Sequence, residues 1–248
     1  NSKNTYEAFY WELEDLVEKI EFDKTIKSII ITSEFSEFFP SNLVHENPEF
    51  VLEHSITQLI SKIRQPVIMS VEKNAKDYGF EMVIAGDLVV CSKESKFSYA
   101  QLYDGIPPLG GITQRLPRLI GVGRSLDIIL TAKDISWNEA LEMNLVQYVS
   151  QTKSLDKSKK ISELISQMAP IAVFYIKEAV KMGMEMTLNQ EFDQSPVEVI
   201  DNSLSFDNTP NRRIEIIQKQ LKSIIDDAIK IEKEFTEIGF QKCELIDV

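Results

Sequence analysis

Hydrophobic residues recur at two different spacings along the first ninety residues. Residues 26–32, 67–71 and 88–91 are short runs of mostly β-branched or aliphatic residues, a pattern typical of buried strands. Residues 6–20 and 51–63 instead carry hydrophobic residues three and four positions apart, which predicts amphipathic helices. Because strands that alternate with helices favour crossover connections, the pattern predicts an α/β domain with a mainly parallel sheet and helices on its faces.

The second half of the chain changes character after Gly111. Most of it predicts helix, with a strand expected only at residues 146–149, and Ser136 with Glu139 has the spacing of a helix capping box. Residues 189–211 are polar, contain two prolines and predict a long connection, after which an apolar stripe at helical spacing runs to about Phe235. We therefore expect a core over residues 1–187 and a divergent helical region over residues 188–248. The apolar stripe of this region is interpreted as a packing face suited to oligomerisation and not as a ligand site.

Charge and cysteine content exclude several classes of partner. The 39 acidic and 27 basic residues among 248 give a net charge of −12, which repels nucleic acid and anionic lipid. No apolar run approaches the ~18–20 residues that a membrane span needs, and no secretory signal opens the sequence. Two cysteines are too few for a disulfide framework, so we expect the protein in the cytoplasm or another reducing compartment. The two cysteines and two histidines are not spaced as a metal cluster, so we expect no bound metal.

The strand predicted at residues 67–71 leads into a helical run that begins near Gly79. A helix start leaves backbone N–H groups without intrahelical acceptors, and these form a natural site for a negatively charged oxygen. Glu81 is expected in the first turn of this helix. A favourable charge at a helix N-terminus is the simpler interpretation of Glu81, and a catalytic carboxylate is the alternative.

An ordered series of short motifs follows from Gly105 onward. It reads Gly105-Ile106-Pro107, Gly110-Gly111, Thr113-Gln114-Arg115-Leu116-Pro117-Arg118, Gly121, Gly123, Leu130-Thr131, Ile135-Ser136, Glu139-Ala140-Leu141 and Leu145-Val146. Upstream, Gln65-Pro66-Val67-Ile68 and Glu81 with Ala85 and Asp87 belong to the same pattern. In this order over about 85 residues, the series resembles the crotonase superfamily, the enoyl-coenzyme A hydratases and isomerases.

The resemblance implies a crotonase-like (ClpP/crotonase) spiral of ββα units with a helical C-terminal region. The sequence begins at the position of the family's first helix, so we expect the core over residues 1–187 to be without the family's usual N-terminal strands, as in a truncated or embedded domain. In this family two backbone N–H groups bind a thioester oxygen as it becomes enolate-like. By position these donors are Leu43, in Phe39-Pro40-Ser41-Asn42-Leu43, and Tyr78, in Asp77-Tyr78-Gly79, where the family usually has a run of glycines.

The resemblance also implies an incomplete pair of carboxylates. Glu81 matches the first glutamate of the hydratases, whereas the second position falls on Gln101, or on Ala100 under a different placement of a one-residue deletion. Glutamine can orient water but cannot exchange a proton near neutral pH. We expect the substrate to contact Gly79, Tyr99 and Pro107. The alternative for Tyr99, and for Tyr103 on the other side of Gln101, is a half-buried structural tyrosine.

Two functions follow from the resemblance. The first is a divergent enoyl-coenzyme A hydratase or isomerase that binds an acyl-coenzyme A, with Glu81 as acid and base and with coenzyme A as part of the substrate and no separate cofactor. Lys73 and Lys76 are candidates for the coenzyme A phosphates, and a solvated lysine pair is the simpler interpretation. The second is a non-catalytic relative with a binding or assembly role. Family members form trimers or pairs of trimers, so a homo-oligomer is expected.

Overall fold

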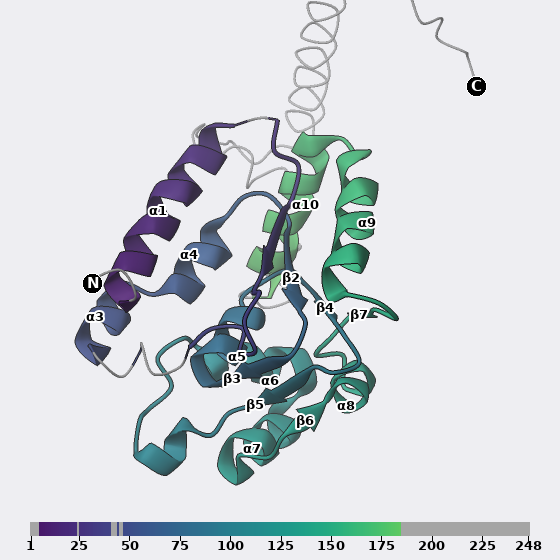
Figure 1. Cartoon of the computed structure of the whole chain (residues 1–248). Coiled ribbons are helices and arrows are strands. Elements are labelled where there is room, and N and C mark those ends of the chain that lie inside the picture. Colours follow the sequence, from purple (N-terminus) through teal and green to yellow (C-terminus); the bar gives the residue numbers. More distant parts are fainter. Residues whose placement is uncertain (1–4, 24, 41–43, 45–46, 185–248) are drawn as a thin grey trace, which may run out of the picture. The chain divides into compact units, whose positions relative to one another are not determined.

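A parallel four-stranded sheet forms the centre of the computed structural model, which describes residues 5–23, 25–40, 44 and 47–184. Its order is β1 (Ile29–Thr32), β2 (Val67–Val71), β4 (Leu88–Cys91) and β7 (Tyr148–Val149), and each neighbouring pair is parallel (Figure 1). All five residues of β2 are buried, as expected for a central strand covered on both faces. The predicted parallel sheet is thus confirmed.

A second, smaller sheet lies beside the carboxyl ends of the main strands. It contains β3 (Asn74–Lys76), β5 (Lys96–Ser98) and β6 (Ile135–Ser136), with β3 parallel and β6 antiparallel to β5. Strands β2 and β3 lead into one helix, and β4 and β5 lead, through a short 3₁₀ helix, into another. These are the ββα units expected of a crotonase-like spiral.

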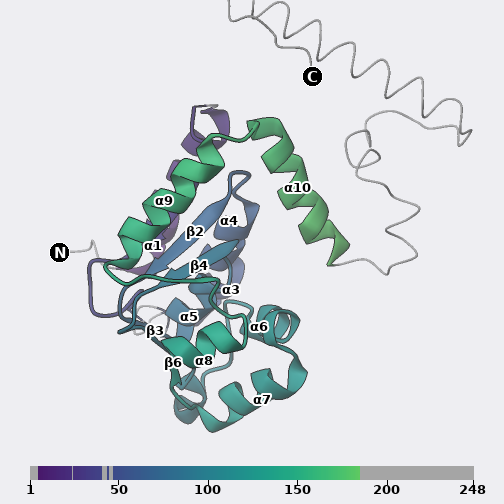
Figure 2. The same ribbon diagram turned by 90° about the vertical axis from the view of Figure 1, so that its right-hand side faces the viewer.

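The helices enclose both sheets. Their bounds are α1 (Tyr6–Phe22), α3 (Pro48–Glu53), α4 (Ile56–Lys62), α5 (Asp77–Val83), η1 (Gln101–Asp104), α6 (Ile112–Ile120), α7 (Val122–Thr131), α8 (Trp137–Glu142), α9 (Ser154–Ser166) and α10 (Pro170–Gly183). The main sheet stands between α1 and α4 on one side and α9 on the other (Figures 1 and 2). None of the helices in the described part of the chain is long and apolar enough to cross a membrane.

Three element boundaries differ from the predicted ones. The helix expected over residues 51–63 is two helices, because Asn47 caps α3 with its side chain and the chain turns at His54 and Ser55 before α4 begins. The strand expected at residues 26–32 starts only at Ile29, whose N–H donates to the carbonyl of Pro66. The strand expected at residues 146–149 is confined to its last two residues.

Other expectations are confirmed or lie outside the described residues. Ser136 and Glu139 form the predicted capping box at the start of α8. The helical stripe that ends near Phe235, and the division between residues 187 and 188, fall outside the described part of the chain, so both stay predictions.

Candidate active site

Glu81 lies in the second turn of α5, not in the first turn as expected, because the helix already begins at Asp77. The Glu81 side chain is fully buried. Its Oε2 accepts a hydrogen bond from the N–H of Gly110 at 2.9 Å, and its Oε1 accepts one from the N–H of Ile112 at 3.0 Å. The carboxylate therefore ties α5 to the start of α6.

Burial dominates the electrostatics of Glu81. It raises the pKa of the carboxyl group from 4.5 to about 7, although the N–H donors of Ile112 and Gly110 and the charge of Arg115 act in the opposite direction. A carboxyl group with a pKa near neutrality can both accept and release a proton at neutral pH, as a general acid or base requires. Each carboxylate oxygen also keeps a second lone pair for a further partner.

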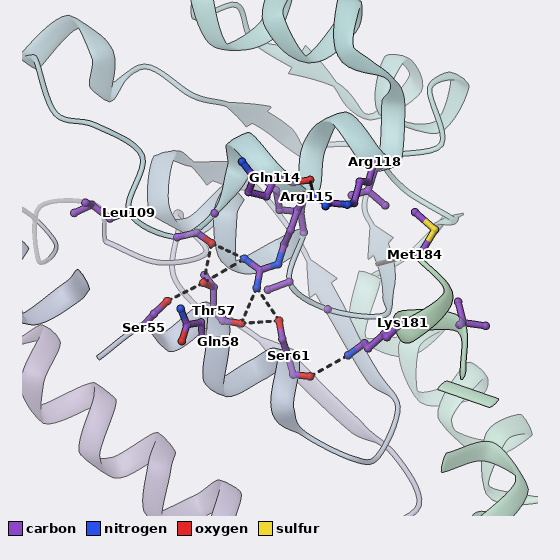
Figure 3. A pocket seen from close by; sticks show the side chains of 17 residues that line it. Ser55, Thr57, Gln58, Ser61, Leu109, Gln114, Arg115, Arg118, Lys181 and Met184 are labelled. Carbon is purple, nitrogen blue, oxygen red and sulfur yellow. Dashed lines mark hydrogen bonds between the residues drawn. The ribbon is translucent and has the colours of Figure 1, made fainter. Parts of the chain in front are cut away.

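Gly110 allows this close contact between helices. A Cβ atom at Gly110 would meet the Cβ of Glu81 at 2.8 Å and its Oε2 at 2.9 Å. On its other side, the Gly110 carbonyl accepts hydrogen bonds from Thr57 Oγ1 at 2.7 Å and from the Arg115 guanidinium at 2.6 Å (Figure 3). Arg115 also donates to Ser61 Oγ at 2.9 Å, so Gly110 and Arg115 join α4 to α6 through a partly buried polar network.

Tyr78, the expected second amide donor, is the second residue of α5, where backbone N–H groups have no intrahelical acceptor. Its side chain is fully buried and its phenol oxygen lies 2.7 Å from that of Tyr6. The Tyr78 ring also packs against Tyr6 and Phe39, with centroid separations of 5.6 and 5.8 Å. The ring thus joins α5 to the aromatic cluster under α1, where a glycine at this position would leave space.

The two segments expected to carry the amide donors lie in contact. Backbone atoms of Phe39 would be 3.2 and 3.3 Å from a Cβ atom at Gly79, so only glycine fits this position without a shift. The N–H of Phe38 donates to the carbonyl of Asn74 at 2.7 Å, which holds the same segment along β3. Leu43, the expected first donor, lies four residues beyond Phe39 and outside the described residues.

Gln101, one of the two residues predicted at the position of the second family glutamate, is also buried. Its Nε2 donates to the hydroxyl of Tyr99 and to the carbonyl of Pro107, the latter at 3.1 Å. Its Oε1 has no hydrogen-bond partner among the described residues. Tyr99 is fully buried, and burial followed by the charges of Glu81 and Asp77 raises the pKa of its phenol, so Glu81, Tyr99 and Gln101 form one cluster.

Tyr103, the other tyrosine beside Gln101, is more exposed than expected. Tyr103 is 81% exposed and not half-buried, because η1 turns it away from the core. The Pro107 side chain is exposed as well, and this residue enters the cluster only through its carbonyl oxygen. The substrate contacts expected of Tyr99 and Pro107 stay predictions.

Asp77 has a role that the sequence did not suggest. It adopts a left-handed conformation with φ of 49°, which glycine tolerates more easily, and its Oδ1 accepts hydrogen bonds from the N–H groups of Ala100 at 2.7 Å and Gln101 at 2.9 Å. The carboxylate thus fixes η1, and with it Gln101, against the start of α5. The only available signal was a non-glycine residue in a position where the family has glycine.

No group of three or more His, Cys, Asp or Glu side chains in the described part of the chain is arranged to hold a metal ion. The cluster around Glu81 is instead a set of hydrogen-bond donors, a neutral amide and one carboxylate. Such a set can stabilise a developing negative oxygen and move a single proton.

Comparisons with known proteins point to one family. The sequence profile of the enoyl-CoA hydratase/isomerase family matches residues 2–208. The short-chain-enoyl-CoA hydratase of Clostridium acetobutylicum is 29% identical over 189 residues, which cover 72% of each chain, and the crotonyl-CoA hydratase of Syntrophomonas wolfei is 31% identical over 190 residues, covering 72% of this chain and 73% of the relative. The crystal structure of an enoyl-CoA hydratase from Bacillus anthracis superposes with a TM-score of 0.69 at 26% identity, covering 87% of this chain and 86% of that one. The chain belongs to the enoyl-CoA hydratase/isomerase family.

Proposed function

We propose that the chain binds an acyl-coenzyme A thioester and shifts the double bond of its acyl group, with Glu81 as the single proton carrier. The observation that carries the proposal is the buried carboxyl group of Glu81, with a pKa of about 7, three residues after the Tyr78 amide. The similarity of the chain to enoyl-coenzyme A hydratases supports an acyl-coenzyme A as the substrate. The backbone N–H groups of Leu43 and Tyr78 are the proposed partners of the thioester oxygen.

The proposed reaction needs only one carboxylate. Glu81 removes a proton from the carbon next to the thioester of a 3-enoyl substrate, and the electron pair delocalises onto the thioester oxygen, where amide donors stabilise it. The protonated Glu81 then returns the proton to the far end of the conjugated system, which yields the 2-enoyl isomer. Hydration would also require a second group to exchange a proton with water, and Gln101 cannot do so.

A 3-enoyl-coenzyme A tests isomerisation and crotonyl-coenzyme A tests hydration. Both reactions are followed by the absorbance of the conjugated thioester. We expect turnover of the 3-enoyl thioester and slower hydration of crotonyl-coenzyme A. Glu81→Gln should reduce isomerisation by roughly 100- to 10,000-fold, the usual contribution of general acid–base catalysis. Glu142→Gln, on the exposed face of α8, is the matched control and should leave turnover unchanged.

The role of Gln101 can be tested by restoring the missing carboxylate. Gln101→Glu should increase hydration relative to isomerisation, since it supplies the second proton-exchanging group. Wild-type turnover that Glu81→Gln does not change would overturn the assignment of Glu81.

A second function is favoured by one specific observation. Both oxygens of Glu81 are bonded to backbone amides and the side chain is fully buried, so a thioester reaches it only when the surrounding segments move apart. This arrangement also suits a non-catalytic domain that binds an acyl thioester or serves in assembly. Saturable heat with acetyl-coenzyme A but no turnover would favour the binding role, and no heat would favour assembly.

The remaining expectations about partners and compartment form part of the same proposal. We expect no cofactor apart from the coenzyme A moiety of the substrate, and a homo-oligomer of three or six chains. A reducing compartment, such as the cytoplasm, is supported by Cys91, a buried free thiol whose pKa burial raises to about 12.

A further inference from the structure

A cavity of about 610 Å³ lies on the side of Gly110 that faces away from Glu81. Its walls come from α4, from the residues that follow α5, from the start of α6 and from the end of α10 (Figure 3). This volume is within the range of roughly 300–1,000 Å³ that is typical of small-molecule sites. Glu81, Tyr78 and Gln101 are not among the lining residues, so the cavity is separate from the cluster described above.

Three cationic side chains line this cavity: Arg115 and Arg118 from α6 and Lys181 from α10. Within the described residues, Arg115 donates hydrogen bonds to neutral oxygens of Thr57, Ser61 and Gly110, and Arg118 donates to the carbonyl of Gln114. Within the described residues, no carboxylate oxygen lies at ion-pair distance from either arginine.

Lys181 forms an ion pair with Asp87, and a second lysine shares this carboxylate. The Lys181 Nζ lies 3.1 Å from Asp87, whose carboxylate also pairs with the buried Lys177. The cavity therefore carries a local excess of positive charge in a chain with a net charge of −12. Because long-range attraction of anions is absent in such a chain, this excess points to a ligand recognised at short range.

The rest of the lining is partly apolar. Leu109 and Leu119 line it beside α6, and Val180 and Met184 line it from α10. Arginine guanidinium groups match the geometry of carboxylate and phosphate oxygens. From these charges and this apolar wall, we propose that the cavity binds a small organic anion, a carboxylate or phosphate group that carries a short alkyl chain.

Calorimetric titration of the whole chain with three six-carbon probes tests this proposal at constant ionic strength, because added salt screens charge interactions. The probes are hexanoate, hexyl phosphate and hexanol. We expect saturable heat with at least one of the two anions and none with hexanol. The stronger anion identifies the head group that the arginines prefer, and hexanol binding as tightly as both anions would overturn the proposal.

Variants locate the binding. Arg118→Gln and Lys181→Met should each weaken binding of the preferred anion by about 10-fold or more, the usual effect of losing a charge-assisted hydrogen bond. Arg124→Ala on the exposed face of α7 is the matched control and should bind as the wild type does. Binding that neither Arg118→Gln nor Lys181→Met changes would place the anion elsewhere and refute the assignment, whether or not the chain turns over acyl-coenzyme A.

Discussion

Glu81 makes the stability of the chain depend on pH. Because the pKa of the folded protein is about 7 and the ordinary value is 4.5, the folded state binds the proton more tightly than the unfolded state does. The stabilising contribution is complete below about pH 4.5 and is lost as the pH rises through about 7. A shift of this size corresponds to roughly 3 kcal/mol in the free energy of unfolding.

Urea unfolding of the wild type and Glu81→Gln between about pH 4 and pH 8 measures this effect. We expect the wild type to lose stability relative to the variant as the pH rises through this interval. The difference between the two proteins removes the contributions of all other titrating groups. Parallel stability curves would show that Glu81 keeps an ordinary pKa.

Gly110 and Gly123 offer a matched pair of glycines in and near helices. Gly110→Ala should destabilise the chain by about 1–3 kcal/mol, the usual range for overpacking, because its Cβ would overlap Glu81. Gly123→Ala in α7 meets no atom within 4 Å and should stabilise the chain by about 0.5–1 kcal/mol through the better helix propensity of alanine. Thermal midpoints of the two variants check both signs, and a neutral Gly110→Ala would mean that α5 and α6 separate easily.

Only those residues of the site that belong to local sequence motifs could be predicted. Motif spacing led to Glu81, Gln101 and the glycine pair before α6. The bond between Asp77 and the N–H of Gln101 spans 24 residues, and the contact between the phenols of Tyr78 and Tyr6 spans 72. No local pattern specifies such contacts, so the sequence could show that glycine was lost at positions 77 and 78 but not what replaced its function.

At the scale of elements, a buried lysine is one of the groups that hold α10 in place. No residue of α10 is fully buried, yet the side chain of Lys177 is only 7% exposed. Its Nζ donates to the carbonyls of Ile63 and Gln65 at 2.7 and 2.8 Å and pairs with Asp87. These bonds hold α10 against the segment that connects α4 to β2.

Lys177→Met should therefore loosen α10 before the rest of the domain. We expect a loss of about 1–3 kcal/mol, since it leaves two carbonyl groups and part of a carboxylate unpaired. Amide hydrogen exchange should become faster in residues 170–183, with little change in β2. Lys160→Ala on the exposed face of α9 serves as control, and unchanged exchange in α10 would contradict the tethering role.

Element prediction succeeded where a run was long enough to show its period. β2 and β4, with five and four mostly aliphatic residues, were predicted at their observed bounds, as was the capping box of α8. Strands β3, β5 and β6 have only two or three residues, which is too short for alternation to be visible. The smaller sheet was therefore expected only through the family resemblance.

For the molecule as a whole, exposed apolar side chains predict self-association. Ile171, Ile176 and Val180 on α10 are 71%, 65% and 63% exposed. Burying such side chains is favourable, and the family resemblance implies trimers or pairs of trimers. Light scattering of the purified chain should give the mass of three or six copies, and a monomer mass at all concentrations would refute this expectation.

The peptide unit of Gly110 faces Glu81 with its N–H and Arg115 with its carbonyl. An anion held by Arg115 would offset the charge that favours an ionised Glu81, and so increase the affinity of Glu81 for a proton. Thermodynamic reciprocity then requires that protonation of Glu81 tighten the hold on the anion by the same factor. The single peptide unit of Gly110 would thus couple the protonation of buried Glu81 to anion binding in the adjacent cavity.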